Sequence, residues 1–209
     1  MVRLRFAPSP TGFLHVGGLR TALFCYLYAR QKSGKFIFRL EDTDQKRLVE
    51  GAERDLIHML EWGGIELDEG PEIGGNFGPY RQSERLEIYR QHVSKLLDED
   101  HAYPCFCSSE RLDNLRDEQR ANSETPRYDG LCRRLKKEES AQRVASGETH
   151  VVRMKIPEIT ETLVLNDLIR GKVSIETSQT EDQVIVKSDG FPTYHLAVVV
   201  DDHLMQITH

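Results

Sequence analysis

The stretch from Phe6 to Gly18 constrains the fold more than any other part of this chain. Its Pro8, Pro10 and Gly12 interrupt regular structure. Alternating residues before it predict a strand at 2–6, and apolar residues at helical spacing after it predict a helix over 19–30. A second alternation predicts a strand at 36–40. The sequence therefore predicts one βαβ unit, the building block of a parallel α/β sheet.

The predicted unit places a polar loop and an acidic cluster at one edge of the sheet. A right-handed crossover makes the two strands parallel, so their carboxyl ends meet where ligands bind in such folds. The first strand ends at Ala7-Pro8-Ser9 and the second at Glu41-Asp42-Thr43-Asp44. Gly17 and Gly18 begin the helix, whose backbone N–H groups favour an anion. His15 can donate to a phosphate oxygen there, although alone it is better explained as a surface histidine at a helix cap.

Three motifs together resemble the glutamyl-tRNA synthetases, the bacterial and organellar kind of class I aminoacyl-tRNA synthetase. They are the loop Ala7-Pro8-Ser9-Pro10-Thr11-Gly12, the segment His15-Val16-Gly17-Gly18, which resembles the "HIGH" signature with a final glycine, and Arg39-Leu40-Glu41-Asp42-Thr43-Asp44. The resemblance runs through nearly the whole chain. It implies an α/β fold, in which an incomplete class I Rossmann-like parallel sheet carries an inserted α+β domain that binds the tRNA acceptor stem.

The resemblance divides the chain into three segments. Residues 1–104 are expected to form the first half of the catalytic domain, 105–187 the inserted domain, and 188–209 the start of the second half. Local patterns predict helices at 50–62, 83–97, 110–120 and 136–145, and strands at 150–156, 162–165, 172–176, 183–187 and 196–200.

Two local expectations concern single segments. The apolar run Leu196–Val200 predicts a buried parallel strand that ends at Asp201-Asp202, with another strand expected where the chain stops at His209. Ser83 is expected to cap a helix, with Glu84 and Arg85 as solvated charges.

The resemblance implies ATP-dependent activation of L-glutamate and its attachment to tRNA(Glu). The glutamate α-carboxylate attacks the α-phosphorus of ATP, and the terminal ribose hydroxyl of the tRNA then takes the glutamyl group. Both steps depend on positioning and charge stabilisation, and the sequence shows no nucleophile–base pair of the triad kind. Mg²⁺ is expected with ATP, mostly on phosphates and waters.

The resemblance also implies roles for single residues. Arg5 and Ser9 hold substrate carboxyl groups, and Glu41 takes the α-ammonium. The alternatives are an exposed edge charge for Arg5, a loop carboxylate for Glu41, and a core position for Tyr194. The candidate catalytic residues are His15, Gly17 and Gly18, the candidate glutamate-binding residues are Arg5, Ala7, Ser9, Glu41 and Tyr194, and the candidate ATP-binding residues are Ala7, His15, Gly17 and Gly18.

Candidate tRNA contacts lie among the basic residues. The net charge of -6 (28 basic against 34 acidic residues) argues against a broad basic coat, but a local patch suffices for a tRNA. Arg127, Arg133 and Arg134 lie near a Tyr-Asp-Gly turn and are candidate phosphate contacts, as is Arg47. The other charges between 105 and 148 are expected to form a solvated face.

A metal site is one possibility for three cysteines, Cys105, Cys107 and Cys132. A closed zinc site needs four ligands, and the position where some family members place a histidine is Arg134 here. Tyr128 matches the ligand of a tRNA-modifying relative. We expect no metal, with zinc unlikely and the thiols left over from a lost site. The cysteines do not predict a disulfide framework, which fits a reducing compartment.

Several family features are not found in these 209 residues. They are the Lys-Met-Ser-Lys-Ser-like loop, the second substrate arginine and the helical anticodon-binding domain. We therefore expect the N-terminal part of a longer enzyme, with little or no aminoacylation on its own. The alternatives are a glutamyl-Q tRNA(Asp) synthetase-like enzyme, which modifies a tRNA base, or a non-catalytic tRNA-binding fragment, with another nucleotide-binding function a distant third.

The sequence and the family resemblance also give expectations for membrane association, oligomeric state and compartment. No run approaches the ~18 apolar residues of a membrane span. We expect a monomer, in the mitochondrial matrix or, as the alternative, the bacterial cytoplasm.

Overall fold

The computed structural model describes residues 1–209, apart from the side chain of Gln179. The chain divides into two compact units, of which unit 1 comprises Met1–His92 with Pro192–His209 and unit 2 comprises Val93–Phe191. No helix in the described part of the chain is long and apolar enough to cross a membrane. The predicted segments 1–104, 105–187 and 188–209 stay a prediction, since compactness alone does not define a functional insertion.

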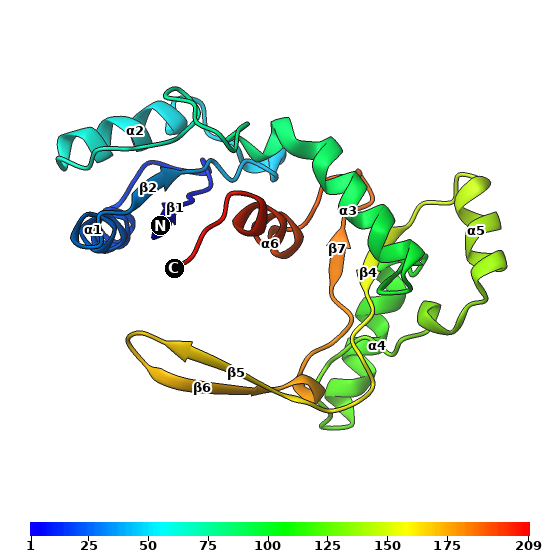
Figure 1. Ribbon diagram of the computed structural model, residues 1–209. Coiled ribbons are helices and arrows are strands. Elements are labelled where there is room, and N and C mark those ends of the chain that lie inside the picture. Colours follow the sequence, from blue (N-terminus) through cyan, green and yellow to red (C-terminus); the bar gives the residue numbers. More distant parts are fainter. The chain divides into compact units, whose positions relative to one another are not determined.

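Unit 1 is built on the predicted βαβ unit (Figure 1). β1 (Arg3–Phe6) pairs in parallel with β2 (Lys35–Phe38), and α1 (Val16–Gln31) connects them. The register sets Phe6 opposite Phe38, so the two strands end side by side. This confirms the α/β class expected from the sequence.

The core of unit 1 lies between this small sheet and two helices. α2 (Ala52–Trp62) begins after Gly51, which takes a φ of 80° that favours glycine, so the helix starts later than predicted. Leu56 and Leu60 of α2 are buried against both strands. The buried cluster comprises Leu4, Phe6, Ala22, Ala29, Phe36, Phe38, Leu40, Leu56, Leu60 and Ile65.

The segment after α2 runs along the free side of β2. Phe38 N donates to Glu69 O and Leu40 N donates to Tyr80 O, both at 2.9 Å. Short 3₁₀ turns lie at η1 (Gln45–Arg47) and η2 (Gln82–Arg85), and α3 (Leu86–Asp98) follows the second.

The expected cap at Ser83 is wrong. Its N and Oγ donate to the Asp42 carboxylate at 2.8 and 2.5 Å, so Ser83 ties η2 to the acidic segment after β2.

The predicted strand at Leu196–Val200 is also wrong, because these residues belong to the helix α6 (Tyr194–Leu204). A short apolar run fits a buried strand and a buried helix equally well. Leu196, Ala197 and Val200 are buried on one face, whereas Val199 on the opposite face is 68% exposed, which is a helical pattern. The last residues form no strand, although Thr208 N donates to Arg3 O beside β1.

Unit 2 contains a small antiparallel sheet in the order β3-β4-β7 and a separate hairpin, β5-β6. The strands are β3 (Ala102–Cys105), β4 (Val151–Met154), β5 (Thr162–Asp167), β6 (Gly171–Glu176) and β7 (Val184–Val186). The other elements are α4 (Ser109–Ala121), η3 (Cys132–Arg134), α5 (Lys137–Ala145) and η4 (Thr177–Gln179). Among the described strands and helices of unit 2, the sequence patterns missed β3 and the short turns η3 and η4. Pro104 is tolerated in β3 because β3 is an edge strand.

Candidate active site

The loop after β1 and the acidic segment after β2 lie side by side. Glu41 N donates to Pro8 O at 2.9 Å, and Val49 N donates to Pro10 O at 3.0 Å. The Glu41 residue is only 4% exposed, so its carboxylate lies at the same sheet edge as the loop and not in solvent. The sequence predicted this juxtaposition from the parallel pairing of two short strands.

His15 is the N-cap of α1. Its Nδ1 accepts from Gly17 N at 3.1 Å, and the ring is exposed. Because Nδ1 accepts, the neutral ring carries its proton on Nε2, where it can donate to a ligand. A Cβ on Gly17 would lie 2.8 Å from His15 Cε1, so the bare backbone at Gly17 is what lets the ring sit over the helix start.

A chain of alternating charges links the two predicted ends of the substrate. Arg5 donates to both oxygens of Asp202, from Nε at 3.2 Å and Nη2 at 3.1 Å. Arg39 donates from Nη1 to Asp202 Oδ1 at 2.6 Å and from Nη2 to Glu41 Oε1 at 2.9 Å. Arg5 and Glu41 are therefore joined through Asp202 and Arg39, and Arg5 is a paired group instead of an unpaired edge charge.

Asp201 is a second, fully buried hub beside this chain. It accepts from Arg85 Nε at 2.7 Å, from Tyr89 OH at 2.8 Å and from Gln82 Nε2 at 2.9 Å. The expectation that Arg85 is a solvated charge is wrong, because Arg85 is 2% exposed. Burial, together with the Asp201 charge, raises the pKa of Tyr89. These contacts fix α6 against η2 and α3.

The charges of this network balance. Three guanidinium groups, from Arg5, Arg39 and Arg85, face the carboxylates of Glu41, Asp201 and Asp202. Burial raises the pKa of Glu41, and the nearby Arg39 only partly offsets this. For Asp202 the hydrogen bonds and charges of Arg5 and Arg39 outweigh burial and lower the pKa. A bound ammonium would favour the ionised form of Glu41.

The other predicted residues of this site are more open. Ser9 is exposed, and its carbonyl accepts from Thr11 N at 2.9 Å, while Ala7 is half-buried. Tyr194 begins α6 and is 55% exposed, so the core alternative for it is wrong. Arg47 is exposed and pairs with Asp44 at 2.6 Å.

The candidate tRNA-binding arginines of unit 2 differ in environment. Arg133 donates to both oxygens of Asp182, at 2.8 and 3.0 Å, and its side chain is 18% exposed. Arg127 and Arg134 are exposed, and the backbone of Arg127 is held by Gln119. The exposed pair is therefore better placed to meet a phosphate than Arg133.

The three cysteines predicted as leftover thiols converge in unit 2. The sulfurs of Cys105, Cys107 and Cys132 lie within 4.8 Å of one another. The Tyr128 hydroxyl lies 3.4 Å from Cys105 Sγ and 3.7 Å from Cys107 Sγ. Cys107 and Cys132 are 3.6 Å apart, close to the roughly 3.8 Å edge of a tetrahedron with 2.3 Å zinc–sulfur bonds. The donor set therefore fits a zinc ion, while the expectation of no metal remains untested.

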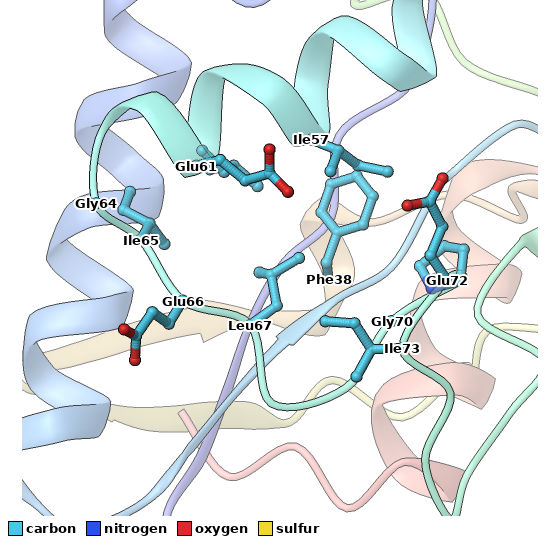
Figure 2. A pocket seen from close by; sticks show the side chains of 12 residues that line it. Phe38, Ile57, Glu61, Gly64, Ile65, Glu66, Leu67, Gly70, Glu72 and Ile73 are labelled. Carbon is cyan, nitrogen blue, oxygen red and sulfur yellow. The ribbon is translucent and has the colours of Figure 1, made fainter.

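A separate hollow of about 450 Å³ opens in unit 1 between α2 and the segment that follows it (Figure 2). Apolar side chains, including Phe38, Leu67 and Ile73, line it together with the carboxylates of Glu61 and Glu72. Its lining contains none of the residues predicted for glutamate or ATP.

Sequence reasoning did not assign roles to Arg39, Gln82, Asp201 and Asp202. A signal existed for Arg39, because Arg39 and Glu41 are two positions apart along an extended segment and so share one face. The sequence shows Asp201-Asp202 after an apolar run, but the predicted strand would end at this pair, whereas the helix α6 contains it. Gln82 and Arg85 offered no pattern that distinguishes a buried partner from a solvated one.

Comparison with known proteins places the chain in a family. The family model described as "tRNA synthetases class I (E and Q), catalytic domain" matches residues 1–209, and the chain belongs to this family. Within it, the chain is 54% identical to the glutamate–tRNA ligase of Alkaliphilus metalliredigens and 55% identical to that of Lysinibacillus sphaericus. The whole chain is covered in each case, but only 43% of each relative.

Solved structures of glutamate–tRNA ligases support the same family assignment. A crystal structure of a glutamate tRNA ligase from Elizabethkingia meningosepticum in complex with its amino acid has a TM-score of 0.92 at 46% identity. The glutamate-tRNA synthetase of Elizabethkingia anophelis gives the same values. Each match covers all of this chain and 43% of the solved chain, so the chain spans less than half of the relatives it matches. The Rossmann-like class I architecture expected from the sequence is confirmed.

Proposed function

We propose that this chain forms the amino-acid-activating site of a glutamate–tRNA ligase. The observation that carries the proposal is the charge chain from Arg5 through Asp202 and Arg39 to Glu41 at the tips of β1 and β2. Glutamate has one ammonium and two carboxylates, so a site for it needs fixed charges of both signs.

In this proposal Glu41 receives the α-ammonium, while Arg5 and Ser9 take carboxyl groups. Arg5 already holds a bidentate carboxylate, Asp202, which pre-orients its guanidinium and leaves its Nη1 for the ligand. Glutamine in place of glutamate would present a neutral amide to Arg5 Nη1 instead of a carboxylate, and the loss of this charge-assisted hydrogen bond would favour glutamate. The exposed ring of Tyr194 and the backbone of Ala7 complete the pocket.

ATP binds at the start of α1. His15 Nε2 donates to a phosphate oxygen as negative charge develops at phosphorus, and the helix dipole acts in the same direction. Gly17 and Gly18 allow the nucleotide to approach the backbone closely. Mg²⁺ accompanies the phosphates, and this chain's own contribution is to orient the two substrates.

The tRNA partner, tRNA(Glu), is the second substrate, with Arg127 and Arg134 of unit 2, and Arg47 of unit 1, as its phosphate contacts. The names of the relatives support ligation to tRNA over the tRNA-modifying alternative. Since those relatives are bacterial, they give no support to the mitochondrial expectation, and the bacterial cytoplasm is the compartment we propose. The monomeric state stays a prediction.

A non-hydrolysable glutamyl-adenylate analogue tests this proposal by calorimetry on the 209-residue chain. We expect it to bind, and its glutaminyl counterpart to bind about tenfold or more weakly. Glu41→Gln and Arg5→Gln should each reduce affinity about tenfold or more, since each removes a charged hydrogen bond. The exposed Glu50→Gln is the matched control. Equal binding of both analogues, or full affinity in Glu41→Gln, would overturn the proposal.

The convergence of four donor atoms favours a second property, zinc binding by unit 2. We propose that Cys105, Cys107 and Cys132, with Tyr128 as the fourth donor, hold one structural zinc ion. Co²⁺ absorption reports thiolate ligation directly. Cys107→Ser should lower the affinity for Co²⁺ at least tenfold, whereas Cys25→Ser, in unit 1, should not. Uptake that is unchanged in Cys107→Ser would contradict this assignment.

A further inference from the structure

A cavity in unit 2 plays no part in the proposed aminoacylation. Its volume is about 600 Å³, within the roughly 300–1,000 Å³ of small-molecule sites. One wall is α5, and the facing wall comes from the end of α3 and from β3. Leu97, Ala102, Leu135 and Val144 give it a largely apolar surface.

One buried polar atom in this lining has no partner. Ser140 of α5 is 9% exposed, and among the described residues nothing bonds its Oγ. A serine inside a helix often donates to the carbonyl four residues earlier. Here that carbonyl, Lys136 O, accepts only the Ser140 N–H at 3.0 Å. A buried hydroxyl without a hydrogen bond is unfavourable, so a ligand that supplied an acceptor would be stabilised.

Several of the polar groups of the cavity gather near the start of α5, where Lys137 and Lys155 both lie close to Asp100. Lys137, Ser140, Ala141 and Val144 share a face of α5 by their helical spacing, with the cation at the start of the helix and the apolar groups towards its end. The helix dipole adds positive potential at the Lys137 end.

Positive charge exceeds negative charge at that end. Lys155 Nζ lies 2.7 Å from Asp100 Oδ2, and Lys137 Nζ lies 3.8 Å from Asp100 Oδ1. Two ammonium groups thus face one carboxylate. The third cation of the lining, Arg133, is held by Asp182 at 2.8 Å. One positive charge therefore remains for a ligand.

We propose that this cavity binds a small organic monoanion with an apolar body. Its carboxylate would lie near Lys137 and Lys155 and accept the Ser140 hydroxyl, and its apolar part would pack on Leu97 and Val144. The contacts proposed for this ligand use no residue of the proposed glutamate or ATP sites, and the zinc site meets the cavity only at Cys132, which is one of its lining residues.

The test uses 4-phenylbutyrate as the probe and 4-phenylbutanol as its neutral counterpart, titrated into the 209-residue chain with ¹⁵N amide shifts as the readout. We expect the carboxylate to saturate shifts in α5 and β3 with an affinity at least five times that of the alcohol. No saturable shift in α5, or equal affinities, would overturn the proposal.

Two variants separate the polar end from general hydrophobic binding. Ser140→Ala and Lys137→Gln should each weaken 4-phenylbutyrate about fivefold and leave the alcohol unchanged, with amide spectra confirming the fold. Lys136→Gln, on the neighbouring position outside the lining, is the matched control. Full affinity for the carboxylate in both variants would refute the assigned polar contacts.

Discussion

Glu41 combines two demands that oppose each other. In the proposed site its carboxylate must be ionised to hold an ammonium, yet burial raises its pKa above the ordinary value of 4.5, and the nearby Arg39 only partly offsets this rise. A group whose folded pKa is raised takes up a proton at higher pH than the free side chain. The ligand-free site therefore loses its charge earlier on acidification than an exposed glutamate would.

This gives a prediction for the pH dependence of ligand binding. Affinity for the glutamyl-adenylate analogue should decline below pH 7 with a midpoint above 4.5, because protonated Glu41 offers no charge to the ammonium. Calorimetry across pH 4–7 measures it. In Glu41→Gln the residual affinity should not decline over this pH range. A decline with the same midpoint in the variant would show that another group titrates.

Gly17 illustrates how one missing carbon can matter for a site. In Gly17→Ala the new Cβ would lie 2.8 Å from His15 Cε1, so the ring must move and the cap to Gly17 N weakens. Losing a cap costs about 1 kcal/mol, but alanine is about 1 kcal/mol more favourable than glycine within a helix.

We therefore expect Gly17→Ala to leave the free energy of unfolding within about 1 kcal/mol of the parent while weakening ATP-analogue binding about fivefold or more. Gly12→Ala is the control, because a Cβ there meets nothing within 4 Å. Urea unfolding and nucleotide titration measure the two quantities. Equal nucleotide affinity in both variants would contradict a role for the His15 position.

At the scale of elements, α6 is held by ion pairs as much as by its apolar face. Asp201 is fully buried and accepts from Arg85, Tyr89 and Gln82, so it ties α6 to η2 and α3. Removing one partner of a buried ion pair leaves the other charge without compensation.

Asp201→Asn should therefore lower the free energy of unfolding by about 3 kcal/mol, because the Arg85 guanidinium stays buried. Chemical denaturation with far-UV circular dichroism measures this. Asp98→Asn, on the exposed end of α3, should change it by less than about 0.5 kcal/mol. A loss in Asp201→Asn no larger than in the control would mean that the apolar face alone holds the helix.

For the whole of unit 1, Arg3 and Glu69 join β1 to the segment beside β2. Arg3 donates to both Glu69 oxygens, at 2.7 and 3.0 Å, and Tyr80 OH donates to Glu69 at 2.6 Å. The hydrogen bonds of Arg3 lower the pKa of Glu69 below 4.5, despite burial. A carboxylate with a lowered folded pKa stabilises the protein above its unfolded pKa and loses this effect as pH falls through the folded value.

The difference in unfolding free energy between the parent and Glu69→Gln should therefore be large at pH 7, about 3 kcal/mol, and shrink below pH 4.5. Urea denaturation at pH 7, 5, 4 and 3 gives this difference directly. The exposed Glu72→Gln serves as control and should show a small difference throughout. A constant gap for Glu69→Gln across this range would exclude the Arg3 pair as its origin.

The sequence by itself determined the parts of this protein that depend on local pattern. The βαβ unit follows from the periodicity of apolar residues and from the prolines and glycines that interrupt regular structure between its elements. The proximity of Glu41 to the Pro8 loop then follows from parallel pairing alone. The helices α4 and α5 of unit 2 were also predicted from the sequence, to within one residue of their bounds.

Only the tertiary structure decided how the charges are paired. Arg5 and Asp202 are 197 residues apart along the chain, and no local pattern ranks Asp202 above other acids as the partner of Arg5 and Arg39. The apolar run in α6 is too short for its period to separate helix from strand, so packing within unit 1 selected the helix. Long-range ion pairs and burial are properties of the folded surroundings, and a local sequence pattern does not encode them.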